Sequence, residues 1–416
     1  MKKNNLKYDV IVIGSGAAGI MSAITLAKLS KKVLLLEKLP KIGTKLKATG
    51  GGKCNLTNTL QPQEFMNSFG KNGRFMRDAL EEFDSQTLRE FFSKIGVLTH
   101  SPDGFRVFPI THDANTIIKA LEIEMQRLNI TIICNEKVEK LNHKNSKIVG
   151  ITTKSSTYLC QNIIIATGGL GYPTLGAEGD GYKLANSVGH KITKLSPAMM
   201  PLKTKESWVS RCTANTIPKV ELRIDLPKMK KLKAKGDLIF TKDGIRGPVV
   251  LDFAREITPL LDKYDEIPIL ANLTKGKNEE QIRLYLKEVA VKNPQYSVAL
   301  CVQTLLPDAI IYELCSLCDI NPSEQFSKLS GFKRDKLIKI LTNTPLTVIG
   351  HDGFKKAMIT RGGVSLKEIN PKTMQSKLIS GLYFCGEVVD LDGPCGGYNL
   401  QWSFSSGFLA GNLKNH

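Results

Sequence analysis

The chain lacks several features that would place it in a class at once. No apolar run in its 416 residues approaches the ~20 residues that a membrane-spanning helix needs, so we expect no membrane partner. Its nine cysteines are odd in number and scattered along the chain. Scattered cysteines exclude the disulfide framework of a small secreted domain and favour a reducing compartment, the cytoplasm.

Sequence patterns of several enzyme and metal sites are also absent. The chain has no HExxH, no P-loop, no EF-hand pattern and no Ser-His-Asp order. The Cys315-x-x-Cys318 pair has no second pair to complete a zinc site, so we expect two buried cysteines in a helical run. The sequence therefore predicts no metal.

Arginine is scarce although the chain is strongly basic. Lysines and arginines number 58 against 39 acidic residues, a net charge of +19, but only 12 of the 58 are arginine. A positive field attracts nucleic acid and anionic cofactors, whereas arginine is the residue that binds phosphates and bases with two hydrogen bonds. We therefore expect a solvated lysine-rich surface and a small-molecule partner, with nucleic acid as the alternative. Nothing in the sequence indicates an oligomeric state.

The strongest pattern lies near the N-terminus. Residues 8–13 (YDVIVI) read as a buried strand, residues 17–29 as a helix and residues 32–36 (KVLLL) as a second strand. A complete G-x-G-x-x-G at residues 14–19 joins the first strand to the helix, and Glu37 follows the second strand. This is the order of a dinucleotide-binding βαβ unit. We therefore interpret the apolar stretch as part of the mature fold and not as a signal peptide.

Each residue of this pattern has a physical task. Gly14 permits a tight turn, Gly16 lets the backbone approach a pyrophosphate, and Gly19 lets helix and strand pack closely. The helix N-terminus offers free N–H groups and a partial positive charge to phosphate. Glu37 can accept hydrogen bonds from two ribose hydroxyls and disfavours a 2′-phosphate, so FAD or NAD fits here better than NADP.

Two later segments favour FAD. Residues 38–55 contain four glycines and five lysines, and we expect a glycine-rich loop rather than a helix, with Lys45 beside an extended anionic cofactor. Residues 162–169 (NIIIATGG) read as a buried strand that ends in a glycine turn. Such turns recur where the chain crosses the dinucleotide in FAD domains.

The end of the chain adds a second glycine-rich region. Residues 381–387 read as a strand and a turn, and residues 393–401 as a loop. Residues 402–413 read as a helix whose N-terminal end, at residues 399–402, would direct its dipole toward a ligand. If that ligand is the N1/O2 edge of a flavin, the dipole stabilises the reduced anion, and Glu387 stands where it can bind ribityl hydroxyls.

The whole chain resembles an FAD flavoprotein family that includes aminoacetone oxidase-type and 3-dehydro-bile-acid reductase-type enzymes, with a glutathione-reductase-like FAD fold. The matching segments, in chain order, are GSGAAG (14–19), KLKATGGGKCNLTN (45–58), GFRVFP (104–109), ATGG (166–169), GAEGDGYKLANSVGH (176–190), LIFTKDGIRGP (238–248), TRGGVSLKEI (360–369) and GLYFCGEVVDLDGPCGGYNLQWSFSSG (381–407). The chain departs from the family pattern at Lys53, where arginine is commoner, at Cys385 and Cys395, and at Arg361. These departures leave FAD binding intact and the substrate open.

Pattern and resemblance together predict an α/β architecture. A doubly wound, Rossmann-like FAD-binding domain covers residues 1–195 and 350–416. An inserted β-barrel-like domain covers residues 196–274 and 341–349 and carries a helical subdomain over residues 275–340. We expect strands at 219–225, 237–241 and 266–270, and helices at 278–292, 296–306, 309–319, 322–330 and 333–341.

The candidate cofactor-binding residues come from the motifs and the resemblance. They are Gly14, Ser15, Gly16, Ala17, Ala18, Gly19, Glu37, Lys38, Lys45, Gly50, Gly51, Gly52, Asn55, Val138, Ala166, Thr167, Gly168, Gly386, Glu387, Gly397, Asn399 and Leu400.

Three further residues are candidates for catalysis. Cys54 can be a redox or covalent group if Lys53 and loop N–H groups lower its pKa, or a small residue packed beside the flavin. Arg106 can orient an anionic or carbonyl group, and Tyr398 can flank the flavin or donate a proton. His112, which follows the Arg106 motif, can face the substrate.

We therefore predict an FAD-dependent oxidoreductase that transfers hydride between a small organic substrate and the flavin N5. Because a second complete GxGxxG is absent, we expect no dedicated NAD(P)H domain. Oxygen would re-oxidise the flavin, or NAD(P)H docking transiently would reduce it. Two alternatives stay open: a nucleic-acid (tRNA) modifying flavoprotein, and a flavin-binding regulatory protein without turnover.

Overall fold

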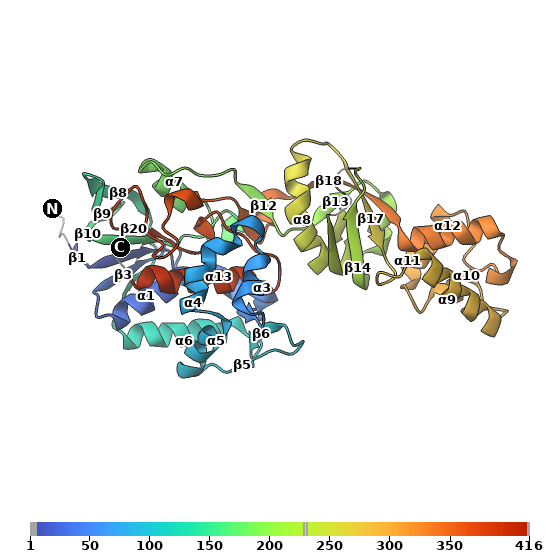
Figure 1. Cartoon of the computed structure of the whole chain (residues 1–416), viewed down its shortest axis with the longest axis horizontal. Helices are drawn as coiled ribbons and strands as arrows, with labels where there is room; N and C mark the ends of the chain where they lie inside the picture. The colour runs from blue at the N-terminus through green and yellow to red at the C-terminus, as the bar shows by residue number, and fades with distance from the viewer. Residues whose placement is uncertain (1–5, 228, 230–231, 414–416) are drawn as a thin grey trace. The chain divides into compact units, whose positions relative to one another are not determined.

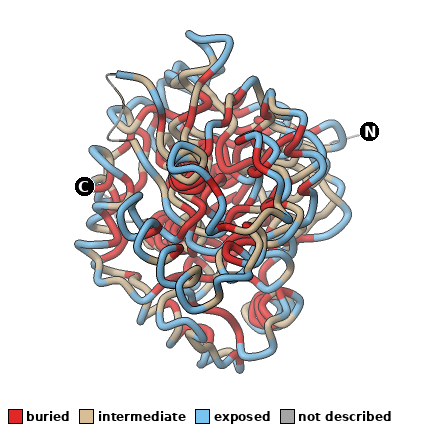
Figure 2. The backbone as a smooth tube through the Cα atoms, turned by 90° about the vertical axis from the view of Figure 1, so that its right-hand side faces the viewer, coloured by how far each residue is buried: buried red, intermediate tan, exposed pale blue. Residues whose placement is uncertain are grey.

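A computed structural model describes residues 6–227, 229 and 232–413. The chain forms two compact units, Met1–Pro197 with Met358–His416, and Ala198–Ala357. Each unit has its own hydrophobic core. Figure 2 shows the buried segments (red) mostly in the interior and the exposed loops (pale blue) around them. The second unit runs from Ala198 to Ala357, whereas the inserted domains were predicted over residues 196–349.

The first unit is built on a sheet of five parallel strands in the order β20-β11-β2-β3-β7. These strands are Leu382–Phe384, Asn162–Ile165, Val10–Ile13, Val33–Leu36 and Thr131–Ile133. Every residue of β2, β3 and β20 is buried, as expected for near-continuous apolar strands covered on both faces. Parallel strands end at the same edge of a sheet, so the segments that follow β2, β3, β11 and β20 meet at that edge.

Two helices pack against each other beside this sheet, α1 (Ala17–Lys28) and α13 (Tyr398–Gly411) (Figure 1). A Cβ on Gly407 would lie 2.3 Å from the carbonyl oxygen of Ala18, so the two backbones are in direct contact. Helix α13 begins four residues before the predicted start at residue 402. Gly397 explains the early start, because its left-handed φ of 84° turns the preceding loop directly into the helix.

Three smaller sheets complete the first unit. Their strand orders are β1-β10-β9-β8, β4-β6-β5 and β12-β19. Their bounds are β1 Leu6–Lys7, β10 Thr157–Leu159, β9 Lys147–Thr153, β8 Val138–Lys144, β4 Thr57–Asn58, β6 Arg106–Pro109, β5 Thr99–His100, β12 Ser196–Ala198 and β19 Ile359–Arg361. The other α-helices are α2 Thr44–Ala48, α3 Pro62–Asn67, α4 Arg77–Glu82, α5 Ser85–Lys94, α6 Ala114–Arg127 and α7 Asp180–Ser187. Short 3₁₀ turns are η1 Thr49–Gly52, η2 Gly70–Met76, η3 Pro173–Leu175, η7 Leu366–Glu368 and η8 Gly386–Val388.

The prediction that residues 38–55 hold no helix is wrong. Helix α2 and the turn η1 occupy residues 44–52. Gly43, with φ 65°, begins α2, and the Lys-Leu-Lys-Ala run that follows has good helix propensity. Leu46 is buried and anchors the helix to the core. The glycines concentrate in η1, where Gly50 and Gly51 have positive φ.

The second unit contains a closed barrel with the strand order β13-β16-β15-β14-β17-β18. The strands are Leu202–Thr204, Gly244–Arg246, Lys233–Thr241, Thr216–Ile224, Ile267–Asn272 and Thr344–His351. Helix α8 (Pro248–Leu261) packs against β15 and was not predicted. It begins with a proline in its first turn, which is a common helix start after a glycine turn.

The inserted helical subdomain has four α-helices, α9 Glu279–Lys292, α10 Val298–Val302, α11 Asp308–Leu317 and α12 Gly331–Thr342. The predicted helix over residues 322–330 is wrong, because this stretch holds only the 3₁₀ turn η5 (Phe326–Lys328). Ser330 instead caps α12, and its side chain accepts a hydrogen bond from the Lys333 N–H. The predicted α/β class with a Rossmann-like sheet and a barrel is confirmed. Among the described residues, no helix is both long and apolar enough to cross a bilayer.

Candidate functional site

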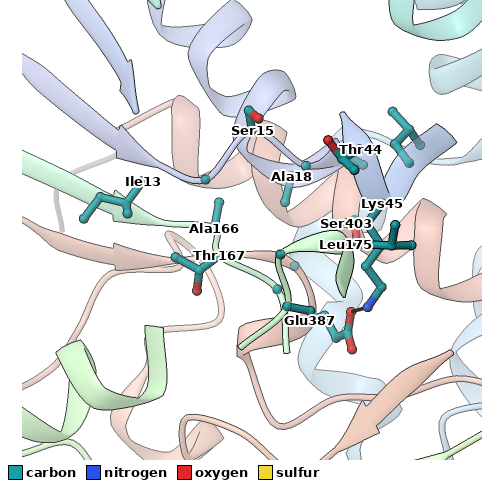
Figure 3. Close-up of a pocket in the computed structure, with 18 of the residues that line it drawn as sticks. Ile13, Ser15, Ala18, Thr44, Lys45, Ala166, Thr167, Leu175, Glu387 and Ser403 are labelled. Carbon is teal, nitrogen blue, oxygen red and sulfur yellow. Dashed lines mark hydrogen bonds and ion pairs between the residues drawn. The ribbon is translucent and has the colours of Figure 1, made fainter. Parts of the chain in front are cut away.

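A pocket lies in the first unit, at the carboxyl edge of the parallel sheet. The turn after β2, the segment after β11, the segment after β20 and the N-terminal turns of α13 all line it. Figure 3 shows Ile13, Ala166 and Thr167 on one side of this pocket and Lys45, Leu175 and Glu387 on the other. Ligands of open α/β sheets bind at this edge.

The glycine turn after β2 has the predicted geometry. Gly14 has a φ of 99°, and a Cβ on Gly19 would lie 1.9 Å from the carbonyl oxygen of Gly14. A Cβ on Gly16 would have no neighbour within 4 Å, so this backbone faces open space in the pocket. The turn can therefore receive a pyrophosphate against bare backbone and the N-terminus of α1.

Glu37 closes the same turn at the end of β3. Its Oε2 accepts a 3.0 Å hydrogen bond from the Ser15 N–H and another from the Ser15 hydroxyl. Its Oε1 accepts a 2.9 Å bond from the Leu39 N–H. Each carboxylate oxygen has further lone pairs, so the fixed carboxylate can also accept hydrogen bonds from a ligand in the pocket that it lines.

A second carboxylate, Glu387, is fixed where β20 ends. Its Oε2 lies 2.8 Å from the Lys45 ammonium, an ion pair drawn in Figure 3. Its Oε1 accepts a 2.9 Å hydrogen bond from the Thr360 N–H, and the Thr360 hydroxyl accepts one of 2.7 Å from the Leu170 N–H. Position 169 requires a glycine, because a Cβ added there would lie 2.7 Å from the Glu387 Oε1. Lys45, which was predicted to lie beside the cofactor, lines the pocket as the ion-pair partner of Glu387.

The N-terminal turns of α13 form another part of the lining. The Asn399 side chain accepts a 2.8 Å hydrogen bond from the Gly393 N–H and donates one of 2.9 Å to the Gly393 carbonyl. The Trp402 indole donates a 3.2 Å bond to the Gly386 carbonyl. These bonds fix the glycine-rich loop to the helix, and Leu400 and Ser403 line the pocket beside it.

The pocket brings together sixteen of the predicted cofactor-binding residues: Gly14, Ser15, Gly16, Ala17, Ala18, Glu37, Lys38, Lys45, Val138, Ala166, Thr167, Gly168, Gly386, Glu387, Asn399 and Leu400. Gly19, Gly50, Gly51, Gly52, Asn55 and Gly397 lie outside the lining. Several of these six are structural neighbours of the site. Gly19 packs on Gly14, and the Asn55 side-chain oxygen accepts a 3.0 Å hydrogen bond from the Gly397 N–H once its amide is oriented to suit its partners.

The sequence analysis did not predict several other residues that line the pocket. They include Leu39, Thr44, Glu136, Lys137, Leu175, Asp180, Thr360, Asp392, Trp402 and Ser403. Leu175, and Glu136 and Lys137 just before β8, lie outside all the segments that the sequence analysis singled out, whereas the others lie in the glycine-rich stretch 38–55 or in segments that carried the resemblance. Asp180 stands within the segment 176–190 that carried the family resemblance, which was the available signal.

The three candidate catalytic residues do not line the pocket. Cys54 is completely buried with a φ of 57°, and burial raises the pKa of its thiol to about 12 despite a hydrogen bond with Thr49. Of the two alternatives for Cys54, the reactive one required a lowered pKa and is contradicted, because burial raises the pKa more than the Thr49 hydrogen bond lowers it. Arg106 is exposed, and its Nε lies 2.6 Å from the Asp103 carboxylate. Tyr398 is buried, and its hydroxyl accepts a 3.2 Å hydrogen bond from Ser68.

His112, Cys315 and Cys318, which the sequence analysis also named, lie outside the pocket lining. The Nε2 atom of His112 lies 2.8 Å from the Nε2 atom of His100, and His112 is not part of the pocket lining. Cys315 and Cys318 are buried and free, and burial raises the pKa of both thiols, to about 12 and about 11. Both cysteines belong to the core of the second unit, as predicted.

These features fit an extended dinucleotide such as FAD. The open backbone at Gly16 suits its pyrophosphate, and Glu37 and Glu387 place two fixed carboxylates at separate points of the pocket where hydroxyl-bearing groups can bind. The N-terminus of α13 adds a positive dipole end.

Comparison with known proteins agrees with this geometry. Residues 8–413 match the family model described as HI0933-like protein Rossmann domain. The chain is 31% identical over 402 residues to the 3-dehydro-bile acid delta(4,6)-reductase of Clostridium scindens, covering 96% of this chain and 97% of the relative. It is 30% identical over 404 residues to the ribosomal RNA dihydrouridine synthase of Haemophilus influenzae, covering 96% of each.

Solved structures share the fold at lower identity. The open conformation of a flavocytochrome c3 fumarate reductase matches with a TM-score of 0.54 and 18% identity, covering 99% of this chain and 78% of the other. The matched family spans nearly the whole chain and includes the glycine turn and the pocket. The chain belongs to the HI0933-like Rossmann family, and it is an FAD-dependent oxidoreductase of that family.

Proposed function

We propose that this protein uses FAD to reduce a carbon–carbon double bond conjugated to a carbonyl group in a small organic substrate. The pocket at the carboxyl edge of the sheet, with two fixed carboxylates and a bare glycine turn, is the observation that carries the proposal. The names of two relatives support the reaction class. One reduces delta(4,6) bonds of a 3-dehydro bile acid, and the other makes dihydrouridine, whose parent uracil ring has a double bond conjugated to a carbonyl.

The chain's own residues would hold the cofactor. The turn at residues 14–18 and the N-terminus of α1 bind the pyrophosphate, and Glu37 accepts hydrogen bonds from ribose hydroxyls. Glu387, held by Lys45 and Thr360, accepts hydrogen bonds from the ribityl chain. Bound FAD supplies the hydride chemistry at its N5 position.

Reduction of the double bond also needs a proton for the second carbon. Tyr398 is our candidate donor, because it begins α13, directly after the glycine-rich loop and before the lining residue Asn399. Arg106 is the candidate that orients the carbonyl group, since its exposed guanidinium can exchange Asp103 for a ligand. Cys54 takes no part in this scheme, because its buried thiol is neutral at physiological pH.

The source of electrons can be identified by spectroscopy. Purified protein is desalted and its flavin absorbance is followed under anaerobic conditions during addition of NADH and then NADPH. We expect one of them to bleach the flavin, because a pyridine nucleotide can dock transiently without its own domain. Addition of a 3-oxo-4,6-diene steroid to the reduced protein should restore the oxidised spectrum. A flavin that reacts with oxygen and never with a conjugated ketone contradicts the proposal.

A uracil ring in RNA is the second candidate substrate. Between residues 38 and 63 the chain has five lysines and no acidic residue, and Lys41, Lys47 and Lys53 are exposed on either side of the lining residues Thr44 and Thr49. The whole chain has a net charge of +19, and this lysine-rich region can attract a polyanion. Incubation of the reduced protein with unmodified ribosomal RNA, followed by nucleoside mass spectrometry, tests it. Dihydrouridine formed in RNA, with no turnover of the steroid, favours this candidate.

A further inference from the structure

Three charged side chains from distant segments converge at one end of the pocket. The Asp180 carboxylate lies 2.6 Å from the Lys38 ammonium through Oδ2 and 2.8 Å from the Lys137 ammonium through Oδ1. Lys38 follows Glu37 at the end of β3, Lys137 precedes β8, and Asp180 begins α7. All three line the pocket. Glu178 adds a fourth charge, 2.8 Å from the Lys38 ammonium but largely exposed.

The segment that carries Asp180 crosses the same end of the pocket. We call residues 171–180 the strap. Its middle, Leu175 to Ala177, lines the pocket, and a Cβ on Gly176 would lie 2.8 Å from the Leu39 side chain. Tyr172, Gly176 and Gly179 all have positive φ, so the backbone path of the strap is set by local turns.

The Asp180–Lys38 ion pair that holds the strap is shielded from solvent, whereas Lys137, the second partner of Asp180, is 52% exposed. The Asp180 side chain is 12% exposed and that of Lys38 is 19% exposed. Burial favours a lower pKa for Lys38, but its hydrogen bonds to Asp180 and Glu178 outweigh burial and raise it. Burial likewise favours a higher pKa for Asp180, but Lys137 and Lys38 lower it. Shielded, charge-assisted contacts are stronger than exposed ion pairs and are less screened by salt.

We propose that the strap retains the adenosine half of the bound dinucleotide, and that Asp180 fastens it by pairing with Lys38 and Lys137. The location supports this assignment. The fastening residue Lys38 follows Glu37, the carboxylate placed for the ribose, and Leu39, whose N–H donates a hydrogen bond to Glu37, lies against the strap at Gly176. Asp180, Lys38 and Lys137 are therefore positioning residues, which act on cofactor release and not on the reacting atoms. The inference rests on the FAD binding of the proposed function but not on its substrate.

The test is the rate at which FAD leaves the intact protein. Flavin fluorescence rises when FAD is released, so dilution of the loaded protein gives a dissociation rate without any substrate. We expect Asp180→Asn to release FAD about tenfold faster, because two charge-assisted contacts are lost, Lys137 loses its carboxylate partner and Lys38 keeps only the exposed Glu178. Glu178→Gln is the matched control. Its side chain is 54% exposed and contacts only Lys38, so its release rate should stay within about twofold of the parent protein.

A second variant separates the strap from a general loss of stability. Asp180 also begins α7, so Asp180→Asn can weaken that helix, whereas Lys137→Met leaves the helix start intact. We expect Lys137→Met to accelerate release in the same direction, with an unchanged melting temperature of the flavin-free protein. Hydrogen exchange should also slow at residues 171–180 when FAD is added.

Either of two results overturns the proposal: a release rate for Asp180→Asn equal to that of the parent, or one no faster than that of Glu178→Gln. Failure of the flavin to react with a conjugated ketone would contradict the proposed reaction and leave this measurement unaffected.

Discussion

The contact between α1 and α13 decides whether replacing Gly407 by alanine stabilises or destabilises the protein. Gly407 lies inside α13, where alanine favours the helix over glycine by about 1 kcal/mol. If the site had room, Gly407→Ala would therefore stabilise the protein. The added methyl group would instead lie 2.3 Å from the carbonyl oxygen of Ala18 and 3.0 Å from its carbonyl carbon and Cα. These are backbone atoms of a buried helix, so no flexible side chain can move aside.

The two effects can be compared directly. Overpacking a well-ordered core costs about 1–3 kcal/mol, and contact with a rigid backbone belongs at the upper end of that range. After the gain in helix propensity, we expect a net loss of about 2 kcal/mol in the free energy of unfolding of the first unit. Loss of this size corresponds to roughly a thirtyfold change in the folding equilibrium constant.

Urea denaturation measures this loss with a local probe. Trp402 in α13 is the one tryptophan of the first unit, so a Trp208→Phe background makes fluorescence report on that unit alone. Gly331→Ala in α12 of the second unit is the control, followed by far-ultraviolet circular dichroism, because a Cβ there has no neighbour within 4 Å. It should be neutral or slightly stabilising. A Gly407→Ala protein as stable as its parent would refute the argument from helix contact.

Three further predictions follow from the site and the buried groups. Glu387→Gln should weaken FAD binding about tenfold, because the Lys45 ammonium loses its charged partner, and titration with FAD measures it; unchanged affinity contradicts the role of Glu387. Iodoacetamide at pH 8 should leave Cys54 unmodified in the folded protein, because its pKa is raised to about 12; mass spectrometry showing rapid alkylation would contradict its burial. Burial lowers the pKa of His190 more than Glu368 raises it. As the pH falls, the His190 imidazole is therefore protonated in the unfolded chain before it is protonated in the folded protein. The free energy of unfolding therefore decreases as the pH drops below about 6.5. His190→Asn should show a shallower loss of stability between pH 7 and pH 5, measured by urea denaturation, and an unaltered pH profile would contradict this.

The βαβ unit could be predicted from sequence because its constraints are local. Gly19 packs on Gly14, and Glu37 bonds Ser15, all within one βαβ unit of about 30 residues, so the pattern itself places these residues together. The start of α13 could not be predicted in the same way. Gly397 reads as part of a loop, and only its left-handed conformation against Thr57 shows that the helix begins directly after it.

The candidate catalytic residues show the limit of sequence reasoning most clearly. A neighbouring lysine suggested a reactive thiol at Cys54, yet its pKa depends on burial, which arises from tertiary packing. Asp180 carried no motif of its own, and its partners Lys38 and Lys137 are distant in the chain. Such sites form where segments distant in the chain pack together, and a single sequence does not predict which segments do so.

The pairing of β12 with β19 has a consequence for the modular design of the protein. These strands are the points where the chain leaves the first unit and returns to it, and they are hydrogen-bonded neighbours. The two ends of the inserted unit therefore start close together, so we expect a change in the length of the insertion to leave the register of the parallel sheet unchanged. Every residue that lines the nucleotide pocket belongs to the first unit, so we expect the pocket to survive exchange or removal of the barrel and its helices. A chain that joins Pro197 directly to Met358 should still fold around its flavin.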